Sequence, residues 1–241
     1  MPSNIPHSDS TGRDPRAGRV GSDEGRHAVL VWDLPLRVFH WLLAVLVAAA
    51  YFTWRFNWMA WHAWCGQAVL ALVLFRLVWG VIGSDTARFS RFLAAPGAAI
   101  RHLARVFRRE PDTQCGHNPA GGWMVLLLLL LLLGQSLSGV IVNNDVANDG
   151  PLTALMPAWV ANLLTGMHAY VWDVLLAAIV LHLLAIGLYA ALKGQNLVLP
   201  MVTGVKSLPA SQPQPRIAGI AAAFLVFCLS VGAAALIAGL A

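Results

Sequence analysis

The chain has 241 residues, of which 58% are hydrophobic and only 11% are charged. Its mean hydropathy is +0.67, whereas soluble domains carry about 25% charged residues, so the composition excludes an ordinary soluble protein. The three cysteines form no C-x-x-C pair, which argues against a zinc site and against covalent attachment of a c-type haem.

The polar first thirty residues mix basic and acidic side chains without the apolar core of a signal peptide, which predicts a mostly disordered cytoplasmic tail over 1–30. Hydrophobic runs near the ~20 residues that a spanning helix needs then fall at 38–56, 62–82, 122–142, 167–192 and 217–240. The sequence therefore predicts an all-α membrane protein with five transmembrane helices. We divide it into the tail, a membrane domain over 31–205, and a linker with an extra helix over 206–241.

Basic residues predict the orientation of these spans. The link between spans two and three carries six arginines, and the link between spans four and five carries Lys193, Lys206 and Arg216. The loops on the opposite side carry only Arg55. By the positive-inside rule the N-terminus is cytoplasmic and the C-terminus lies outside. The net charge of +5 then reflects orientation, and binding of nucleic acid need not be invoked.

Two features of the link between spans two and three predict local structure. Ile100, Leu103 and Phe107 recur at helical spacing among arginines, which predicts a short amphipathic helix on the inner leaflet. Docking of a partner is the alternative use of this helix. Asn118 and Pro119 supply a cap and a first-turn proline for the third span.

Four histidines fall at two depths of the predicted bundle. His168 and His182 are fourteen residues apart, so they share one helix face and lie roughly 21 Å apart along its axis. His40 opens span one on the cytoplasmic side, and His62 opens span two on the outer side. Depth therefore pairs His40 with His182, the inner pair, and His62 with His168, the outer pair.

Two imidazoles on opposite sides of a flat cofactor predict a six-coordinate haem, which moves electrons and leaves no open site for gas. Zinc would require a third or fourth ligand nearby, and neither level supplies one in register. The alternative is that these histidines are ordinary interfacial residues. Asp173 faces away from His168 and is expected to form an interhelical hydrogen bond, with proton handling as the alternative. We expect the other histidines to be solvated: His7, His27, His102 and His117.

Two arginines are candidates to bind haem propionates. Arg76 follows His62 by fourteen residues, so it shares that face and lies at the level of the inner pair. Arg37 lies one turn before His40, and both arginines have the alternative role of positive-inside anchors. Gly66, one turn after His62, would let a porphyrin approach the helix, although glycine is also common at helix contacts. No residue is predicted to be catalytic.

Several segments resemble the bacterial cytochrome b561 family, which includes the b-type cytochrome subunits of nickel–iron hydrogenases. The opening Val31-Trp-Asp-Leu-Pro-Leu-Arg-Val-Phe-His-Trp41 carries the resemblance most specifically, together with the His168 and His182 pair. Further similar segments are Arg76–Gly80, Ala87–Phe89, Gly116–Gly121, Lys193–Val198 and Met201–Gly204. The resemblance implies a four-helix transmembrane bundle around two non-covalent b haems with the four histidines as ligands, and it implies quinone chemistry.

These observations predict a di-haem cytochrome of the bacterial inner membrane that carries electrons between quinone and a periplasmic redox partner, either a cytochrome c or a hydrogenase-like enzyme. One alternative is a stand-alone superoxide or quinone oxidoreductase. Another is a transporter that uses the histidines for metal or protons, although no span is interrupted by proline in its middle. We expect the fifth helix to lie outside the haem bundle, with Gly219, Gly232 and Gly239 either packing on another subunit or forming part of a plain anchor.

Overall fold

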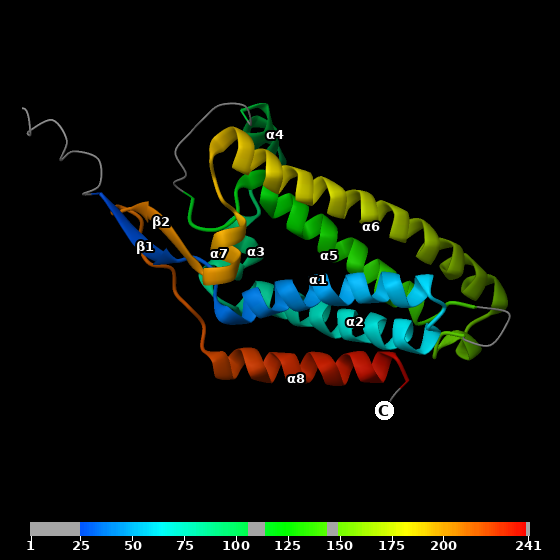
Figure 1. Cartoon of the computed structure of the whole chain (residues 1–241). Coiled ribbons are helices and arrows are strands. Elements are labelled where there is room, and N and C mark those ends of the chain that lie inside the picture. The colour runs from blue at the N-terminus through cyan, green and yellow to red at the C-terminus, as the bar shows by residue number, and fades with distance from the viewer. Residues whose placement is uncertain (1–24, 106–113, 144–148, 240–241) are drawn as a thin grey trace, which may run out of the picture.

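The computed structural model describes residues 25–105, 114–143 and 149–239 (Figure 1). Five helices are long and apolar enough to cross a membrane, and they confirm the five predicted spans. They are α1 (Leu34–Arg55), α2 (Met59–Ile82), α5 (Pro119–Gly139), α6 (Ala158–Lys193) and α8 (Ile220–Ile237). The shorter elements are β1 (Arg26–Leu30), η1 (Asp85–Ala87), α3 (Phe89–Phe92), α4 (Pro96–Ala104), η2 (Thr153–Leu155), α7 (Val198–Thr203) and β2 (Val205–Pro209).

Helix boundaries follow from capping residues. Asp33 caps α1, where its Oδ1 atom accepts a hydrogen bond from the backbone N–H of Leu36 at 2.7 Å. Asn118 caps α5 through the N–H of Gly121 at 2.7 Å, with Pro119 in the first turn as predicted. The amphipathic helix α4 is also present, although the predicted Phe107 lies outside the described residues.

Helix α6 is longer than the sequence predicts. It begins at Ala158, nine residues before the predicted start at 167, and it has 36 residues. At 1.5 Å per residue it is about 54 Å long, which exceeds the ~30 Å hydrocarbon core of a bilayer. His168 lies ten residues after the first residue of α6 and His182 lies eleven residues before its last, so neither histidine is at a frayed helix end.

Helix α2 is the centre of the arrangement, because α1, α5 and α8 all pack against it while α6 packs on α5 (Figure 1). The face of α8 that is buried against α2 consists of small side chains at helical spacing: Ala223, Val226, Ser230 and Ala234. Helix α8 lies on the side of α2 away from α6, as expected for a helix outside the bundle. A side chain at Gly232 would meet open space among the described residues.

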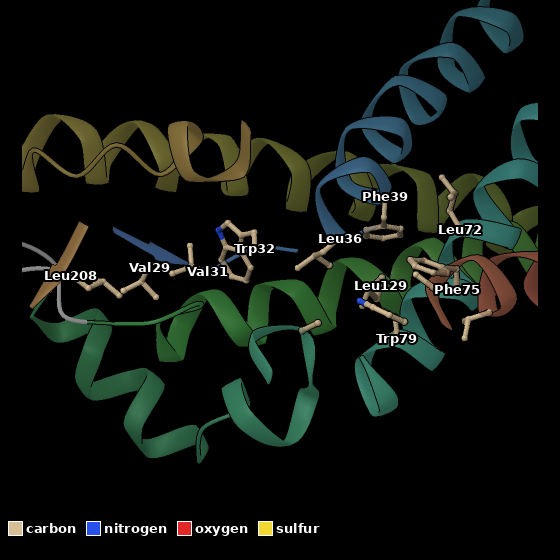
Figure 2. Packing of buried hydrophobic residues seen from close by; sticks show 13 residues of the cluster. Val29, Val31, Trp32, Leu36, Phe39, Leu72, Phe75, Trp79, Leu129 and Leu208 are labelled. Carbon is tan, nitrogen blue, oxygen red and sulfur yellow. The ribbon is translucent and has the colours of Figure 1, made fainter. Parts of the chain in front are cut away.

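The largest apolar cluster surrounds the start of α1 and the last turns of α2 (Figure 2). Trp79 is fully buried at its centre and stacks on Phe75, with ring centroids 5.8 Å apart. The other members come from β1, the two residues after it, α1, η1, α5, β2 and α8, so this cluster holds six elements together around α2.

A two-stranded antiparallel sheet joins segments that the sequence analysis assigned to the tail and the linker. Strand β1 pairs with β2 in a register that sets Arg26 opposite Pro209, and Val29 and Leu208 are fully buried. The predicted tail is therefore wrong over residues 26–30. The two strands are nearly 180 residues apart in sequence, so no local periodicity reveals their pairing.

Gly204 closes this sheet against the start of α1. Its φ is +85°, and its carbonyl accepts hydrogen bonds from the N–H groups of Val31 and Trp32 at 2.8 and 3.1 Å. A Cβ at this position would lie 2.9 Å from the carbonyl oxygen of Trp32. Only glycine combines this backbone conformation with so close an approach.

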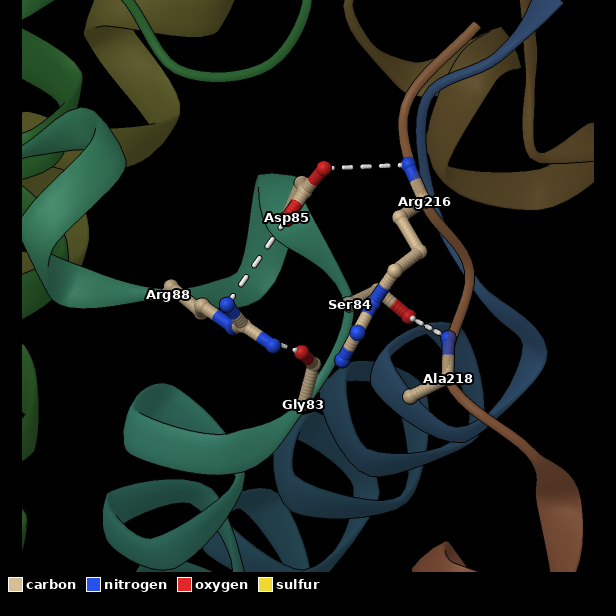
Figure 3. A network of polar contacts seen from close by, with 6 residues as sticks. All are labelled: Gly83, Ser84, Asp85, Arg88, Arg216 and Ala218. Carbon is tan, nitrogen blue, oxygen red and sulfur yellow. Dashed lines mark hydrogen bonds and ion pairs between the residues drawn. The ribbon is translucent and has the colours of Figure 1, made fainter.

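A polar network ties the segment before α8 to the end of α2 (Figure 3). The Ser84 hydroxyl accepts a hydrogen bond from the N–H of Ala218 at 2.9 Å. Asp85 exchanges two bonds with the backbone of Arg216, at 3.0 and 3.1 Å. The entry to α8 is therefore held in place by backbone hydrogen bonds as well as by apolar packing.

Candidate functional site

The outer pair of histidines meets across α2 and α6. The ring centroids of His62 and His168 are 6.3 Å apart, and the two planes are nearly perpendicular at 88°. Two imidazoles that bind one metal from opposite sides at about 2 Å per bond have ring centres roughly 6 Å apart. The pairing that depth predicts is thus present here, and its spacing fits a metal held between the rings.

Backbone oxygens orient both rings of the outer pair. Nδ1 of His62 lies 2.8 Å from the carbonyl oxygen of Ala50, and Nδ1 of His168 lies 3.0 Å from that of Gln135. A histidine whose Nδ1–H donates to a carbonyl is a neutral tautomer that can bind metal through Nε2. Nε2 of His168 lies 3.2 Å from the side-chain amide nitrogen of Gln135.

The end of α5 provides further positioning groups that the sequence analysis missed. The hydroxyl of Ser138 lies 3.1 Å from Nδ1 of His168. A Cβ on Gly139 would lie only 2.9 Å from Cε1 of the same ring, so glycine lets the imidazole pack directly on α5. The run Gln135-Ser-Leu-Ser-Gly139 at the end of an otherwise apolar helix was the available sequence signal. Near His62, by contrast, a Cβ on Gly66 would meet open space among the described residues.

The inner pair lies at the other end of the bundle. His40 is in the second turn of α1, and its Nδ1 atom is buried without a hydrogen-bond partner in the described structure. His182 is fourteen residues after His168 on α6, on the same face. Both rings act electrostatically on a third histidine, His117, which places the three side chains in one neighbourhood.

An apolar layer separates the two pairs. It is built around four buried side chains, Val69 and Val73 from α2, Leu132 from α5 and Leu175 from α6. On α6 this layer falls between His168 and His182 in sequence, and on α1 it is completed by residues that follow His40. Packed apolar side chains therefore fill the middle of the bundle formed by α1, α2, α5 and α6, and the two histidine pairs lie on either side of this layer.

Arg76 lies at the level of the inner pair as predicted, and it is almost fully buried, with 1% of its surface exposed. Its guanidinium packs over the rings of Phe89 and Phe92, at 4.9 and 5.8 Å from their centroids. Both terminal nitrogens lack a hydrogen-bond partner in the described structure. A buried cation with unsatisfied donors is costly unless it meets an anion, so Arg76 fits a carboxylate-binding role.

Arg37 has a different environment. Its terminal nitrogen donates to the carbonyl oxygen of Val202 in α7, and its Nε atom is buried without a partner in the described part of the chain. The indole N–H of Trp41 donates to the neighbouring carbonyl of Met201 at 3.3 Å. Arg37 thus holds α7 against α1, and its buried Nε atom is available to contact another group.

His117 corrects the expectation that the remaining histidines are solvated. Its ring lies between Trp32 and Phe92, with centroids 4.6 and 4.7 Å away, and its Nδ1 atom is buried without a partner in the described residues. Burial, reinforced by the nearby positive charge of Arg76, lowers the pKa of His117 to about 3. The ring is therefore neutral at physiological pH. Its burial could not be predicted from the sequence, because a loop histidine beside arginines is typical of a solvated residue.

Two other expectations about polar residues also change. Nε2 of His102 lies 2.6 Å from the hydroxyl of Tyr189, which also accepts a hydrogen bond from Asn118 at 3.1 Å, so His102 joins α4 to α6. His27 lies within β1 with its Nδ1 atom buried, while His7 lies outside the described residues. Asp173 is exposed on α6 and forms no interhelical hydrogen bond within the described ranges.

The donor set fits haem better than a simple metal ion. Within the part of the chain that is described, no three His, Cys, Asp or Glu side chains come together as a metal-ion site. His62 and His168 instead meet as a pair, and a buried arginine whose terminal nitrogens have no hydrogen-bond partner in the described structure lies at the inner level.

Comparison with known proteins gives one match. Residues 31–204, most of the chain, match the family model described as Prokaryotic cytochrome b561. No curated protein and no solved structure matches the chain. The matched segment contains all four paired histidines, both candidate arginines and His117, and it ends before β2.

Proposed function

Because the chain belongs to the prokaryotic cytochrome b561 family, and is therefore a multi-pass membrane b-type cytochrome of electron transfer, we propose that it holds two b haems and carries electrons across the membrane between quinone and a periplasmic redox partner. The observation that carries this proposal is the meeting of His62 and His168 at 6.3 Å between ring centroids, at the opposite end of α6 from His182.

The four histidines would be the axial ligands, with His40 and His182 on the cytoplasmic side and His62 and His168 on the periplasmic side. When bound, haem supplies a one-electron carrier whose potential the protein tunes through ligation, hydrogen bonding and burial. The Ala50 and Gln135 carbonyls would orient the outer ligands and keep their Nε2 atoms directed inward. Arg76 would neutralise a propionate at the inner level, and Arg37 is a second candidate through its Nε atom.

The orientation of the chain in the bacterial inner membrane supports a periplasmic partner. The basic links, α4 and the β1–β2 sheet lie at the end of the bundle that carries the inner pair, which the positive-inside rule assigns to the cytoplasm. The segment between α5 and α6 lies at the other end and is too short for a domain of its own. A partner such as a cytochrome c or a hydrogenase-like enzyme would therefore bring its own redox centre to the outer pair.

The ligand assignment is tested by spectroscopy of the purified protein. We expect bands of reduced low-spin b haem at two haems per chain. His40→Ala and His182→Ala should each remove the inner haem, and His62→Ala should remove the outer one. His102→Ala is the matched control, because this histidine contacts Tyr189 rather than a paired ring. A colourless wild-type protein would contradict haem binding, and loss of one and the same haem in His40→Ala and His168→Ala would contradict the pairing.

The direction and partner of electron transfer need a separate experiment. Holoprotein in liposomes should be reduced by a quinol and reoxidised by external cytochrome c, with faster rates than protein-free vesicles. Superoxide added outside tests the stand-alone oxidoreductase. Reduction by superoxide without any reaction with quinol would favour a different function for the same fold.

A further inference from the structure

Besides Arg37 and His40 of α1, three further buried polar groups near the inner pair have atoms without a hydrogen-bond partner in the described structure. They are the two terminal nitrogens of Arg76, the hydroxyl of Thr86 and Nδ1 of His117. Arg76 and Thr86 are 1% and 6% exposed. Since nearly all buried polar atoms in folded proteins are paired, each such atom requires an explanation. Only Arg76 was expected at this level from the sequence.

The carboxylate of Asp33 does not satisfy Arg76. Asp33 acts on Arg76 electrostatically, but both of its oxygens are already bonded. Oδ1 accepts the N–H of Leu36 at 2.7 Å, and Oδ2 accepts the indole N–H of Trp79 at 3.0 Å. Among the described residues, no carboxylate is therefore hydrogen-bonded to the forked donor of Arg76, which is left for another anion.

Aromatic packing brings Arg76 and His117 to the same place. Phe92 contacts both side chains, with its ring centroid 5.8 Å from the guanidinium carbon of Arg76 and 4.7 Å from the centroid of His117. Phe89 reaches the guanidinium because α2 has glycine at position 80, where a Cβ would lie 2.0 Å from the ring. The guanidinium and the imidazole are thus fixed around one phenyl ring.

The loop before α5 brings Thr86 to this cluster. Gly116 has a φ of +109°, and a Cβ on it would lie 3.7 Å from the Thr86 side chain and 3.9 Å from Trp32. Gly116 therefore packs beside η1, and His117 is the next residue. The three unsatisfied groups come from α2, η1 and the loop before α5, so the tertiary fold is needed to assemble them.

The chemistry of the three groups selects an anion. A guanidinium has only donors, a hydroxyl can donate, and a neutral imidazole donates from one of its nitrogens. A planar carboxylate matches the arginine fork best. His40 and His182 also act on His117 electrostatically, so the cluster lies beside the inner pair.

We propose that Arg76, Thr86 and His117 form one binding site for a propionate carboxylate of the haem held by His40 and His182. The inference rests on the proposed function, and it adds two binding residues to it. A site with one cation and two neutral donors partly neutralises the carboxylate. A less exposed negative charge stabilises the ferric state less, so this site raises the midpoint potential of the inner haem relative to a free propionate.

A redox titration of the holoprotein tests the site. The inner haem is first identified as the one missing in His40→Ala. Arg76→Gln and His117→Ala should each lower the potential of that haem and leave the potential of the other unchanged. Thr86→Val should act in the same direction with a smaller shift. His117→Asn, which keeps an N–H donor near the Nδ1 position, should lie close to the wild type.

Arg88→Gln is the matched arginine control, since Arg88 bonds to the carbonyl of Gly83 and pairs with Asp85 nearby. It should shift neither potential. Arg76→Lys keeps the positive charge but loses the two parallel N–H donors of the guanidinium. It replaces Arg76→Gln in the experiment if that variant fails to fold. We also expect the double variant Arg76→Gln/His117→Ala to shift the potential by less than the sum of the single shifts.

The outcomes separate this inference from the proposed function. A wild-type protein without haem contradicts the proposed function itself. Two intact haems whose potentials do not respond to Arg76→Gln or His117→Ala would overturn the propionate site. Loss of a copurifying phospholipid in these variants with unchanged potentials would assign the cluster to a lipid phosphate, which also overturns it.

Discussion

Asp33 caps α1 through one hydrogen bond and joins it to α2 through a second, and its removal should be among the costliest single substitutions in the chain. The side chain is 1% exposed, caps α1 through Leu36, and accepts the indole N–H of the fully buried Trp79 at 3.0 Å. A helix cap contributes about 1 kcal/mol, and a hydrogen bond to a charged group contributes about 1.5–3 kcal/mol. Asp33→Ala should therefore lower the free energy of unfolding by about 2.5–4 kcal/mol.

A double-mutant cycle isolates the bond to Trp79. Asp33→Asn keeps the cap oxygen but turns an amide toward the indole, and Trp79→Phe removes the donor. Their coupling energy should be about 1.5–3 kcal/mol. The loss of charge near Arg76 occurs in both variants that contain Asp33→Asn, so it cancels in the cycle.

Denaturant unfolding in detergent, followed by far-ultraviolet circular dichroism, measures these free energies. The control is the cycle of Asp33→Asn with Trp123→Phe, because Trp123 donates to the carbonyl of Ala94 and not to Asp33. That cycle should be additive. A coupling below about 0.5 kcal/mol between Asp33 and Trp79 would refute the reasoning.

Three further predictions concern separate parts of the molecule. Gly139→Ala should displace the His168 ring, since its Cβ would lie 2.9 Å from Cε1, and should alter the spectrum of the outer haem only; Gly134→Ala, where the Cβ meets open space among described atoms, should leave it unchanged. The pKa of about 3 at His117 lies below its ordinary value of 6.5. The contribution of the neutral, buried ring to the free energy of unfolding is therefore fully present above pH 6.5. That contribution should fall by up to about 1.4 kcal/mol per pH unit on acidification. Unfolding midpoints of His117→Asn should show a shallower acid dependence than the wild type. Ala234→Leu should overpack the α8–α2 contact, where Ala234 is 3% exposed, and lower the melting temperature without changing haem content.

The spans and the outer histidine pair were predictable from the sequence because both depend on helical periodicity alone. A fourteen-residue spacing fixes a shared face, and membrane thickness fixes which histidines can meet, so His62 and His168 could be paired without a structure. The match to the family model agrees with the resemblance of the opening motif.

What the sequence did not reveal depends on contacts between distant segments. His117 is buried by Trp32 and Phe92, which are 85 and 25 residues away, so nothing near it in sequence marks it as buried. The β1–β2 sheet joins segments separated by the whole membrane domain. The extension of α6 to Ala158 was missed because Asn162 and Thr165 interrupt the hydropathy without interrupting the helix.

The position of the β1–β2 sheet has a consequence for how the chain is divided. The family match covers 31–204, and the two strands, at Arg26–Leu30 and Val205–Pro209, adjoin it on either side. The sheet therefore holds the two ends of the membrane domain next to each other in space. Helix α8 follows β2 in the chain, so it is an addition to the membrane domain that packs on the outside of α2. Its gain or loss during evolution would leave the path of the chain through the bundle unchanged.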